Sequence, residues 1–284
     1  MRTDIGSRTD VGRVRNSNED NYRVVPALNL FVLSDGMGGE AHGEIASAMA
    51  VESVAAHCLA ASNNLATPFF GETRSDLSEK TNRLSSAVYL ANRKIHEAAT
   101  VNAAQRGMGT TILAAWLDGQ RLSLVHVGDS RAYLLRGGAL EQLTSDHSLV
   151  AEQVRRGLLT PQQADASEMQ SVLIRALGTQ PSVDIDTDEQ LLIDGDALLL
   201  CSDGLTCMVT DPEIASTLLN YPGAQSATDR LVELANDYGG QDNITVVVVR
   251  IEFGSNGLIS RLRRIFGDKK NSGAPTSPFS GGGH

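Results

Sequence analysis

The chain has 284 residues, of which 41% are hydrophobic and 20% charged, and its formal net charge at pH 7 is −10. This length can bury the core of one large domain or two small ones, and the acidic balance argues against nucleic acid as a partner, because binding to phosphates needs a lysine and arginine surface. Three cysteines without a Cys-x-x-Cys spacing fit a reducing compartment, and we find neither an apolar signal segment nor a run of apolar residues long enough to span a membrane, so we expect a cytoplasmic protein.

The N-terminal third predicts a hairpin followed by two helices. Residues 1–20 are polar, and two short apolar runs, Tyr22–Val25 and Leu28–Leu33, are typical of paired strands. Apolar residues recur at helical spacing over Glu44–Ala61, where Ile45, Ala48, Met49, Ala55, Ala56 and Leu59 form a stripe broken only by Glu52. A second helix is predicted over Lys80–Ala99, and the two helices are expected to form an antiparallel pair.

The period changes to that of strands from Thr110 onwards. An antiparallel meander is predicted with turns at Asp118-Gly119 and Gly137-Gly138, and its strands are Thr110–Leu117, Arg121–Val127, Ala132–Arg136 and Ala139–Leu143. A polar helical insertion follows between Asp146 and Gly178. The remaining predicted elements are strands at Gln190–Ile193 and Ala197–Cys201, helices near Pro212 and over Ala224–Asn236, and a strand over Ile244–Ile251.

This order departs from the regular alternation of strands and helices in a parallel sheet. It predicts an α+β fold, a four-layer α-β-β-α sandwich in which two mostly antiparallel sheets are covered by antiparallel helix pairs. One folded domain is expected over residues 1–253. Residues 254–284, with ends rich in Gly, Ser and Pro, are expected to form a flexible tail.

Four aspartates lie at the edges of apolar strands, beside glycine-containing turns. Asp35, Asp129 and Asp203 follow such strands, and Asp242 stands just before the last one. Turn chemistry explains one or two of these sites, but not four. Carboxylates gathered at one rim repel one another and raise each other's pKa unless a cation lies between them. Oxygen ligands select hard divalent ions rather than zinc, so the sequence predicts a metal centre.

Seven short motifs occur in one order along the chain: Arg15-x-x-Asn-Glu-Asp20, Asp35-Gly36-Met-Gly-Gly39, Gly107-Met-Gly-Thr-Thr111, Gly128-Asp-Ser-Arg131, Thr144-Ser-Asp-His147, Ser202-Asp-Gly204 and Asp242-Asn-Ile-Thr245. Their order and spacing resemble those of the bacterial metal-dependent (PPM, type 2C) protein serine/threonine phosphatases. The resemblance covers about residues 3–252. It implies that residues 1–253 form a phosphatase catalytic domain.

The resemblance also implies a set of metal ligands. The carboxylate of Asp35 is expected to bridge two Mn²⁺ or Mg²⁺ ions. Asp203 and Asp242 complete the protein ligands of the first ion, while Glu19 and the backbone carbonyl of Gly36 hold the second. Glycine suits that task because it has no Cβ to block close approach of the backbone.

Three further residues have implied roles. Asp129 corresponds to the ligand of a third, weaker ion, so two or three ions are expected. Asp20 orients water bound to the metals. Arg15 binds phosphoryl oxygens with a planar fork of donors, which lysine cannot supply; without the resemblance it is most simply a solvated loop residue. Two ions about 3.5–4 Å apart convert a bridging water into a hydroxide for in-line attack on phosphorus. The predicted reaction is therefore hydrolysis of phosphoserine and phosphothreonine in proteins.

The general acid is left open by the sequence. Met37 stands where animal relatives carry a histidine after Asp-Gly, and Glu40 stands where bacterial relatives often carry one after Gly-Met-Gly-Gly. His42, His147 or a metal-bound water are the candidates for protonating the leaving group. The alternative for both histidines is a supporting hydrogen bond.

Residues 148–175 correspond to the mobile flap of the bacterial phosphatases. Long polar insertions beside a site often shape substrate entry. Thr160 and Pro161 are typical of the start of a short helix. The candidate substrate-contacting positions are Ser148, Leu158, Thr160 and Arg175.

The tail carries a predicted basic amphipathic helix at about 257–267. Leu258, Leu262, Ile265 and Phe266 share one face, opposite three arginines. This pattern fits peripheral contact with an anionic membrane, contact with a partner protein, or docking on the acidic body of the chain.

The expected partners are phosphorylated proteins, chiefly bacterial Ser/Thr kinases and their targets, and we expect a monomer. Two alternatives to such a phosphatase stay open. One is a phosphatase-like regulatory binding module without turnover. The other is a partner-switching phosphatase that acts on an anti-sigma antagonist.

Overall fold

The computed structural model describes residues 1–38, 42–165, 167, 169 and 171–254. Residues Met1–Glu252 form one compact unit, and Phe253–His284 are separate from it. The predicted helix at 257–267 lies outside the described residues.

Two antiparallel sheets form the centre of this unit. One has the strand order β1-β11-β10-β7-β8 and the other β2-β3-β5-β6-β9, with the short β4 paired to β3. The strands of the first sheet are β1 (Arg2–Asp10), β11 (Ile244–Glu252), β10 (Ala197–Cys201), β7 (Arg131–Arg136) and β8 (Ala139–Gln142). Those of the second are β2 (Asp20–Val25), β3 (Leu30–Met37), β4 (Gly109–Thr110), β5 (Ile112–Asp118), β6 (Arg121–Val127) and β9 (Asp186–Leu191).

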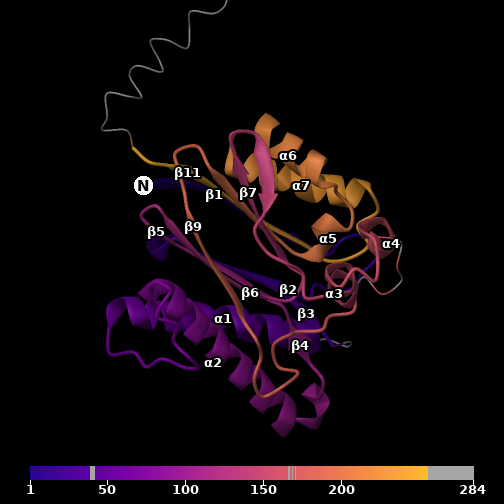
Figure 1. Ribbon diagram of the computed structural model, residues 1–284. Helices are drawn as coiled ribbons and strands as arrows, with labels where there is room; N and C mark the ends of the chain where they lie inside the picture. The colour runs from indigo at the N-terminus through magenta and orange to yellow at the C-terminus, as the bar shows by residue number, and fades with distance from the viewer. Residues whose placement is uncertain (39–41, 166, 168, 170, 255–284) are drawn as a thin grey trace, which may run out of the picture. The chain divides into compact units, whose positions relative to one another are not determined.

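Two pairs of helices cover the outer faces of the sheets. Helices α1 (His42–Asn63) and α2 (Glu79–Val101) share a buried core with β3, β5 and β6. Helices α6 (Asp211–Asn220) and α7 (Ala224–Asp237) share another with β7, β10 and β11. Figure 1 shows the resulting order of layers, with α6 and α7 above and α1 and α2 below. The predicted α-β-β-α sandwich is confirmed.

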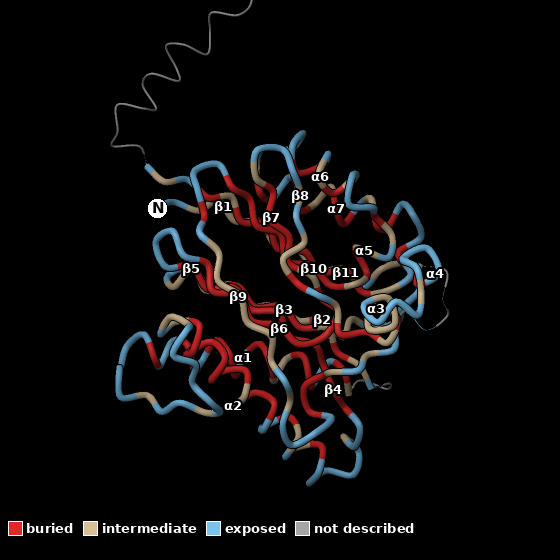
Figure 2. Tube along the Cα trace, viewed as in Figure 1, coloured by how far each residue is buried: buried red, intermediate tan, exposed pale blue. Residues whose placement is uncertain are grey.

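The remaining helices are short. They are α3 (Leu149–Arg155), α4 (Pro161–Asp165), α5 (Asp203–Thr206) and the 3₁₀ turns Pro26–Leu28 and Ala103–Gln105. Figure 2 shows the inner strands of both sheets buried, the edge strands β1, β2, β8 and β9 only partly buried, and the α3–α4 segment largely exposed. Because each sheet has a helical layer on one face and the other sheet on the second, strands such as Leu30–Leu33 and Ala197–Cys201 are apolar on both faces. This explains why they read as continuous apolar runs rather than as alternating ones.

The predicted four-stranded meander is wrong, because β6 and β7 belong to different sheets. Only the hairpins β5–β6 and β7–β8 are formed as predicted. The chain crosses between the sheets at Gly128–Ser130. Gly128 has φ +115°, and a Cβ there would lie 2.5 Å from the side chain of Thr111, so glycine is needed at the crossing.

The N-terminal polar segment contains a strand that the sequence pattern did not reveal. Strand β1 is an edge strand paired with β11 along its whole length, and Ile5 is its one apolar residue. A strand with a single apolar side chain gives no hydrophobic period. Strand β9 also begins earlier than predicted, at Asp186, and Leu191 and Ile193 are exposed.

Helix α1 buries a different face from the predicted stripe. Ala46, Ala50, Val54 and Cys58 are fully buried, whereas Leu59 is 44% exposed. Small residues allow the helix to approach the sheet closely, and a search for large apolar side chains misses such a face. Helix α2 does bury the predicted Leu84, Val88, Ala91 and Ile95.

Helix α1 is also long and apolar enough to cross a membrane by length and composition, with a mean hydropathy of 1.4 over its best window. We expected no apolar run of this length from the sequence, and helix α1 is an exception to that expectation. More than half of that window is buried in the protein, where the helix packs on the six-stranded sheet. This is the environment of a core helix.

Candidate metal centre

The β2–β3 hairpin brings the first acidic residues together. Asp20 and Asp35 are direct partners in the antiparallel register, and Glu19 precedes β2 in sequence. Strand β3 does not end at Asp35 as predicted: it continues to Met37, and Gly36 pairs with Thr110 of β4. The Asp35 carboxylate is therefore held by a strand with a partner on each side.

Three further aspartates reach the same place from other elements. Asp129 lies in the crossing between β6 and β7, Asp203 is the first residue of α5, and Asp242 stands two residues before β11. Figure 1 shows α5 at the end of the sheets where α3 and α4 also lie. All three, with Glu19 and Asp35, line one cavity of about 430 Å³. The structure thus brings the predicted acids together from both sheets.

Burial and mutual repulsion perturb this group strongly. Burial, followed by the charges of Asp20, Asp203 and Asp129, raises the pKa of Asp35 well above its usual range. Burial and the Asp203 charge raise the pKa of Asp129 to about 8. The pKa of Asp20 is raised to about 7, again chiefly by burial. Without a cation these carboxyls resist ionisation at neutral pH.

Two carboxylate oxygens of the group are buried without a hydrogen-bond partner among the described residues: Asp20 Oδ1 and Asp203 Oδ1. Asp20 Oδ2, in contrast, accepts hydrogen bonds from Ser202 (2.8 Å) and Thr245 (2.6 Å). A buried oxygen without a partner costs free energy unless something binds it. The residues present therefore fit hard divalent cations, because the donors are all oxygens and their charge is otherwise uncompensated.

Arg15 lies at the rim of the cavity. Its Nη2 is 2.7 Å from Asp242 Oδ2, and its side chain is 55% exposed. It is the one basic side chain among the described residues that line this cavity. A guanidinium at the mouth of an acidic cavity is placed to meet an anionic ligand entering from solvent.

The structure gives a second reason for glycine at position 36. Its N–H donates to the carbonyl of Glu19 at 3.2 Å. A Cβ on Gly36 would lie 2.1 Å from the carbonyl oxygen of Gly43, in the first turn of α1. The glycine therefore lets the helix pack directly against the strand that carries Asp35.

The two candidate histidines lie in different surroundings. His42 is the first residue of α1, next to residues 39–41, which the structure does not describe. His147 is fully buried. Its Nδ1 accepts from the backbone N–H of Gly128 at 3.1 Å, and its Nε2 is 3.2 Å from Asp186. These contacts favour the supporting role for His147 over that of a proton donor.

The flap positions are spread over the segment. Ser148 and Thr160 immediately precede α3 and α4, and their side chains accept from Ala151 N–H and Gln163 N–H. Leu158 is 67% exposed, and Arg175 bonds to Asp186 at 2.8 Å. A groove of about 1050 Å³ runs between this segment and α5 and reaches Asp129, Asp203 and Asp242.

Sequence reasoning missed several residues that build the centre. Ser171 and Leu173 of the flap line the acidic cavity itself. Asn243 accepts from Glu19 N–H at 2.8 Å and donates to the carbonyls of Val11 and Ser17, so it fastens the loop before β2 beside Asp242. Asn243 and the Asp20 partners Ser202 and Thr245 stood inside the recognised motifs, which was the available signal.

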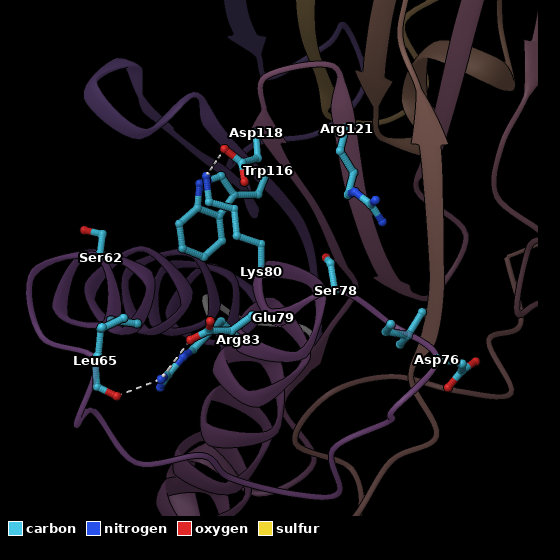
Figure 3. A pocket seen from close by; sticks show the side chains of 12 residues that line it. Ser62, Leu65, Asp76, Ser78, Glu79, Lys80, Arg83, Trp116, Asp118 and Arg121 are labelled. Carbon is cyan, nitrogen blue, oxygen red and sulfur yellow. Dashed lines mark hydrogen bonds and ion pairs between the residues drawn. The ribbon is translucent and has the colours of Figure 1, made fainter.

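A separate cavity of about 740 Å³ lies between the end of α1, the start of α2 and the β5–β6 turn. Figure 3 shows Lys80 beside Trp116 and paired with Asp118, at 3.0 Å. Arg83 donates to the carbonyl of Leu65 at 2.9 Å. These cations are engaged by neighbouring acids and carbonyls, so the pocket has none of the uncompensated charge of the acidic centre.

The chain matches one known protein family over most of its length. The family model of protein phosphatase 2C matches residues 13–247. The chain belongs to this family. Its phosphatase relatives include serine/threonine phosphatase stp of Listeria monocytogenes, 37% identical over 255 residues, which cover 88% of this chain and 96% of the relative. Protein phosphatase PhpP of Streptococcus pneumoniae is 37% identical over 250 residues, covering 87% and 96%.

Solved structures of serine/threonine phosphatases are similar to this one. The serine/threonine phosphatase PstP/Ppp of Mycobacterium tuberculosis has a TM-score of 0.78 at 36% identity, covering 88% of this chain and 99% of that one. The catalytic domain of PstP in complex with two manganese ions has a TM-score of 0.75 at 37% identity, with the same coverage. The predicted family and activity are confirmed: the chain is a metal-dependent protein serine/threonine phosphatase.

Proposed function

We propose that the phosphatase holds two divalent ions, Mn²⁺ or Mg²⁺, in the acidic cavity and hydrolyses phosphoserine and phosphothreonine there. Asp35, Asp203, Asp242, Glu19 and the backbone carbonyl of Gly36 would hold these ions. The observation that carries this proposal is the set of buried carboxylates, drawn from both sheets, with raised pKa values and unpartnered oxygens. When bound, such ions activate water and neutralise phosphoryl charge.

The residues of the chain then divide the remaining work. Arg15 binds the phosphoryl oxygens at the cavity mouth, where it exchanges its ion pair with Asp242 for the substrate. Asp20 orients the attacking water through its free Oδ1, since Ser202 and Thr245 fix Oδ2. Asp129 is the ligand of a third, weaker ion. His42 stays a candidate for the proton donor to the leaving group, tested by the pH–rate profile of His42→Ala.

The substrates are phosphorylated proteins, and we assign among them bacterial Ser/Thr kinases and the proteins they modify. A partner-switching substrate is distinguished by the same measurement. A comparison of the phosphoproteome in cells carrying the wild-type chain and Asp35→Ala should show phosphoserine and phosphothreonine sites that rise only in the variant. Enrichment on kinases supports the first assignment, and enrichment on a single anti-sigma antagonist contradicts it.

We further propose a cytoplasmic monomer whose catalytic domain spans residues 1–253. The basic segment at 257–267, for which the sequence predicts an amphipathic helix, is proposed to contact an anionic surface. Co-sedimentation with anionic vesicles should fall on truncation after Gly254, while hydrolysis of a small aryl phosphate stays unchanged. Equal sedimentation of both forms would contradict the membrane contact.

Manganese-dependent hydrolysis of p-nitrophenyl phosphate tests the central proposal. Activity should require added Mn²⁺ or Mg²⁺ and should disappear with a chelator. Zinc should not replace these ions, because the ligand set has no histidine or cysteine. Activity that persists in the chelator would overturn the assignment of the acidic cavity.

A further inference from the structure

A second group of titratable side chains lies next to the acidic centre and has no role in the proposed reaction. His126 is the penultimate residue of β6, His147 stands just before the flap, Arg175 lies at the end of the flap, and Asp186 begins β9. The two imidazole rings stack with their centroids 4.7 Å apart. Arg175 Nη1 lies 2.8 Å from Asp186 and 3.3 Å from His147 Nε2.

Two histidines and a carboxylate at this spacing have the composition of a metal site, but the hydrogen bonds exclude one here. The backbone N–H of Gly128 can only donate, so the Nδ1 atom of His147 that accepts it carries no proton. A neutral ring then carries its proton on Nε2, which faces Asp186. Burial and His126 lower the pKa of His147, which keeps the ring neutral. A metal at Nε2 would have to displace both this proton and the Arg175 guanidinium, which lies 3.3 Å away and already supplies the positive charge.

His147 is bonded twice to the turn that carries Asp129. Its backbone N–H donates to the Gly128 carbonyl at 2.9 Å, while its ring accepts from the Gly128 N–H. On the other side of Asp129, Asp146 binds the Arg131 guanidinium in a bidentate pair at 2.7–3.1 Å. Two consecutive residues thus hold both flanks of Asp129.

The same histidine holds the base of the flap. Its carbonyl accepts from Ile174 N–H at 2.9 Å, and the next pair along is Leu149 N–H to the Val172 carbonyl at 2.8 Å. Asp186, the partner of the His147 ring, is the residue that Arg175 binds. The beginning and the end of the flap therefore meet at this ring.

We propose that His147 is a positioning residue that joins the Asp129 turn to the base of the flap. Its Nδ1 side fixes the turn through Gly128, and its Nε2 side fixes the end of the flap through Asp186 and Arg175. The inference rests on the proposed role of Asp129 as ligand of the third, weaker ion. It assigns one function to each ring nitrogen, and each can be removed separately.

Two variants of the full chain separate the roles of the two ring nitrogens of His147. His147→Asn places an amide oxygen near the position of Nδ1, so it retains the acceptor for Gly128 and loses the contact with Asp186. His147→Gln places its amide near Nε2, so it retains the donor to Asp186 and loses the acceptor. Asp186→Asn weakens the flap side without touching Gly128, and serves as a second variant if either substitution at the buried position fails to fold.

Manganese titration by calorimetry and amide hydrogen exchange provide the readouts. His147→Gln should weaken the weakest manganese-binding step on the order of tenfold, as losses of partners behind metal ligands do, and should speed exchange of the Gly128 amide. His147→Asn and Asp186→Asn should leave that step near the wild-type value and speed exchange within residues 148–175 instead.

Equal losses in both readouts for His147→Asn and His147→Gln would show a merely structural role and overturn the inference. So would a wild-type chain that hydrolyses phosphopeptide but binds only two manganese ions, an outcome that leaves the proposed function intact. Failure of the proposed function itself is distinguishable, because the wild-type chain would then show no manganese-dependent activity at all.

Discussion

Two groups of titratable side chains meet at the Gly128–Asp129 turn and differ in how their charges are balanced. The acidic centre consists of Glu19, Asp20, Asp35, Asp129, Asp203 and Asp242, and the histidine cluster of His126, His147, Arg175 and Asp186. In the acidic centre, burial and neighbouring carboxylates raise the pKa of Asp35 and Asp129, and buried oxygens lack partners. In the histidine cluster, burial alone would raise the pKa of Asp186, but the hydrogen bond from His147 and the charge of Arg175 lower it. One group needs a cation from outside, and the other contains its own.

The difference shows that residue types alone do not identify a metal site. Two histidines and an aspartate within reach of one another match common ligand sets, yet His147 Nδ1 and both Asp186 oxygens already have partners. The acidic group contains no histidine, but among the described residues two of its buried carboxylate oxygens have no partner, and Arg15 pairs with Asp242 alone. Spare lone pairs and net charge decide which cluster binds an ion.

The largest expected effect separates the two clusters directly. Asp35→Asn should lower manganese-dependent hydrolysis by about 10³-fold or more, since metal catalysis supplies several kcal/mol. The same change should raise the melting temperature of the metal-free protein, because it removes a buried, repelled carboxylate. Glu141→Gln, at an exposed position of β8, is the matched control and should change neither quantity. A retained activity in Asp35→Asn would place the metals elsewhere.

Arg15 provides the next test, at the mouth of the acidic centre. Arg15→Lys keeps the charge but loses the bidentate geometry, so kcat/KM for a phosphopeptide should fall about tenfold or more. Steady-state kinetics with phosphopeptide and the stoichiometry of bound manganese measure the effect. The stoichiometry should not change, because Arg15 is not a ligand. A loss of bound metal would show that Arg15 acts on Asp242 instead of on the substrate.

The pH dependence of stability sharpens the contrast further. Without metal, Asp20 and Asp129 have folded-state pKa values of about 7 and about 8, against 3.8 when unfolded. The folded state therefore binds more protons, and its free energy of unfolding falls as the pH rises from about 4 through 8. Bound ions replace those protons. The rise in melting temperature on adding Mn²⁺ should thus be larger at about pH 7.5 than at about pH 5.5. The difference should be roughly 2–4 °C for each kcal/mol by which the free energy of unfolding of the metal-free protein falls between these two pH values. The opposite order would contradict the raised pKa values.

The smallest expected effect concerns the flap. Deletion of residues 158–166 removes the exposed Leu158 and helix α4, whose Pro161 and Ala164 line the groove that leads to Asp129, while the base held by His147 is retained. Activity toward a phosphopeptide should fall several-fold more than activity toward a small aryl phosphate, which does not fill the groove. Parallel assays on both substrates provide the measurement. Equal losses would exclude a role of this segment in substrate selection.

The sequence by itself determined the chemistry and most of the elements. These are local properties of the sequence: the apolar runs of β3, β10 and β11, the buried face of α2 with Leu84 and Ile95, and the spacing of the acidic residues in their motifs. They depend on side-chain type and on periods of two or 3.6 residues. The order of strands and helices was sufficient to predict a sandwich of antiparallel sheets.

Only the tertiary structure decided which strands are neighbours and which side chains meet. The chain changes sheets at Gly128, and this choice places Asp129 beside Asp203 rather than along a meander. Strand β1 is held by β11, at the opposite end of the unit's sequence, and has one buried apolar residue. The His147 ring bridges the Gly128 turn and Asp186, 39 residues downstream along the sequence. Such pairings depend on long-range packing and on hydrogen-bond geometry, which no local pattern of residues encodes.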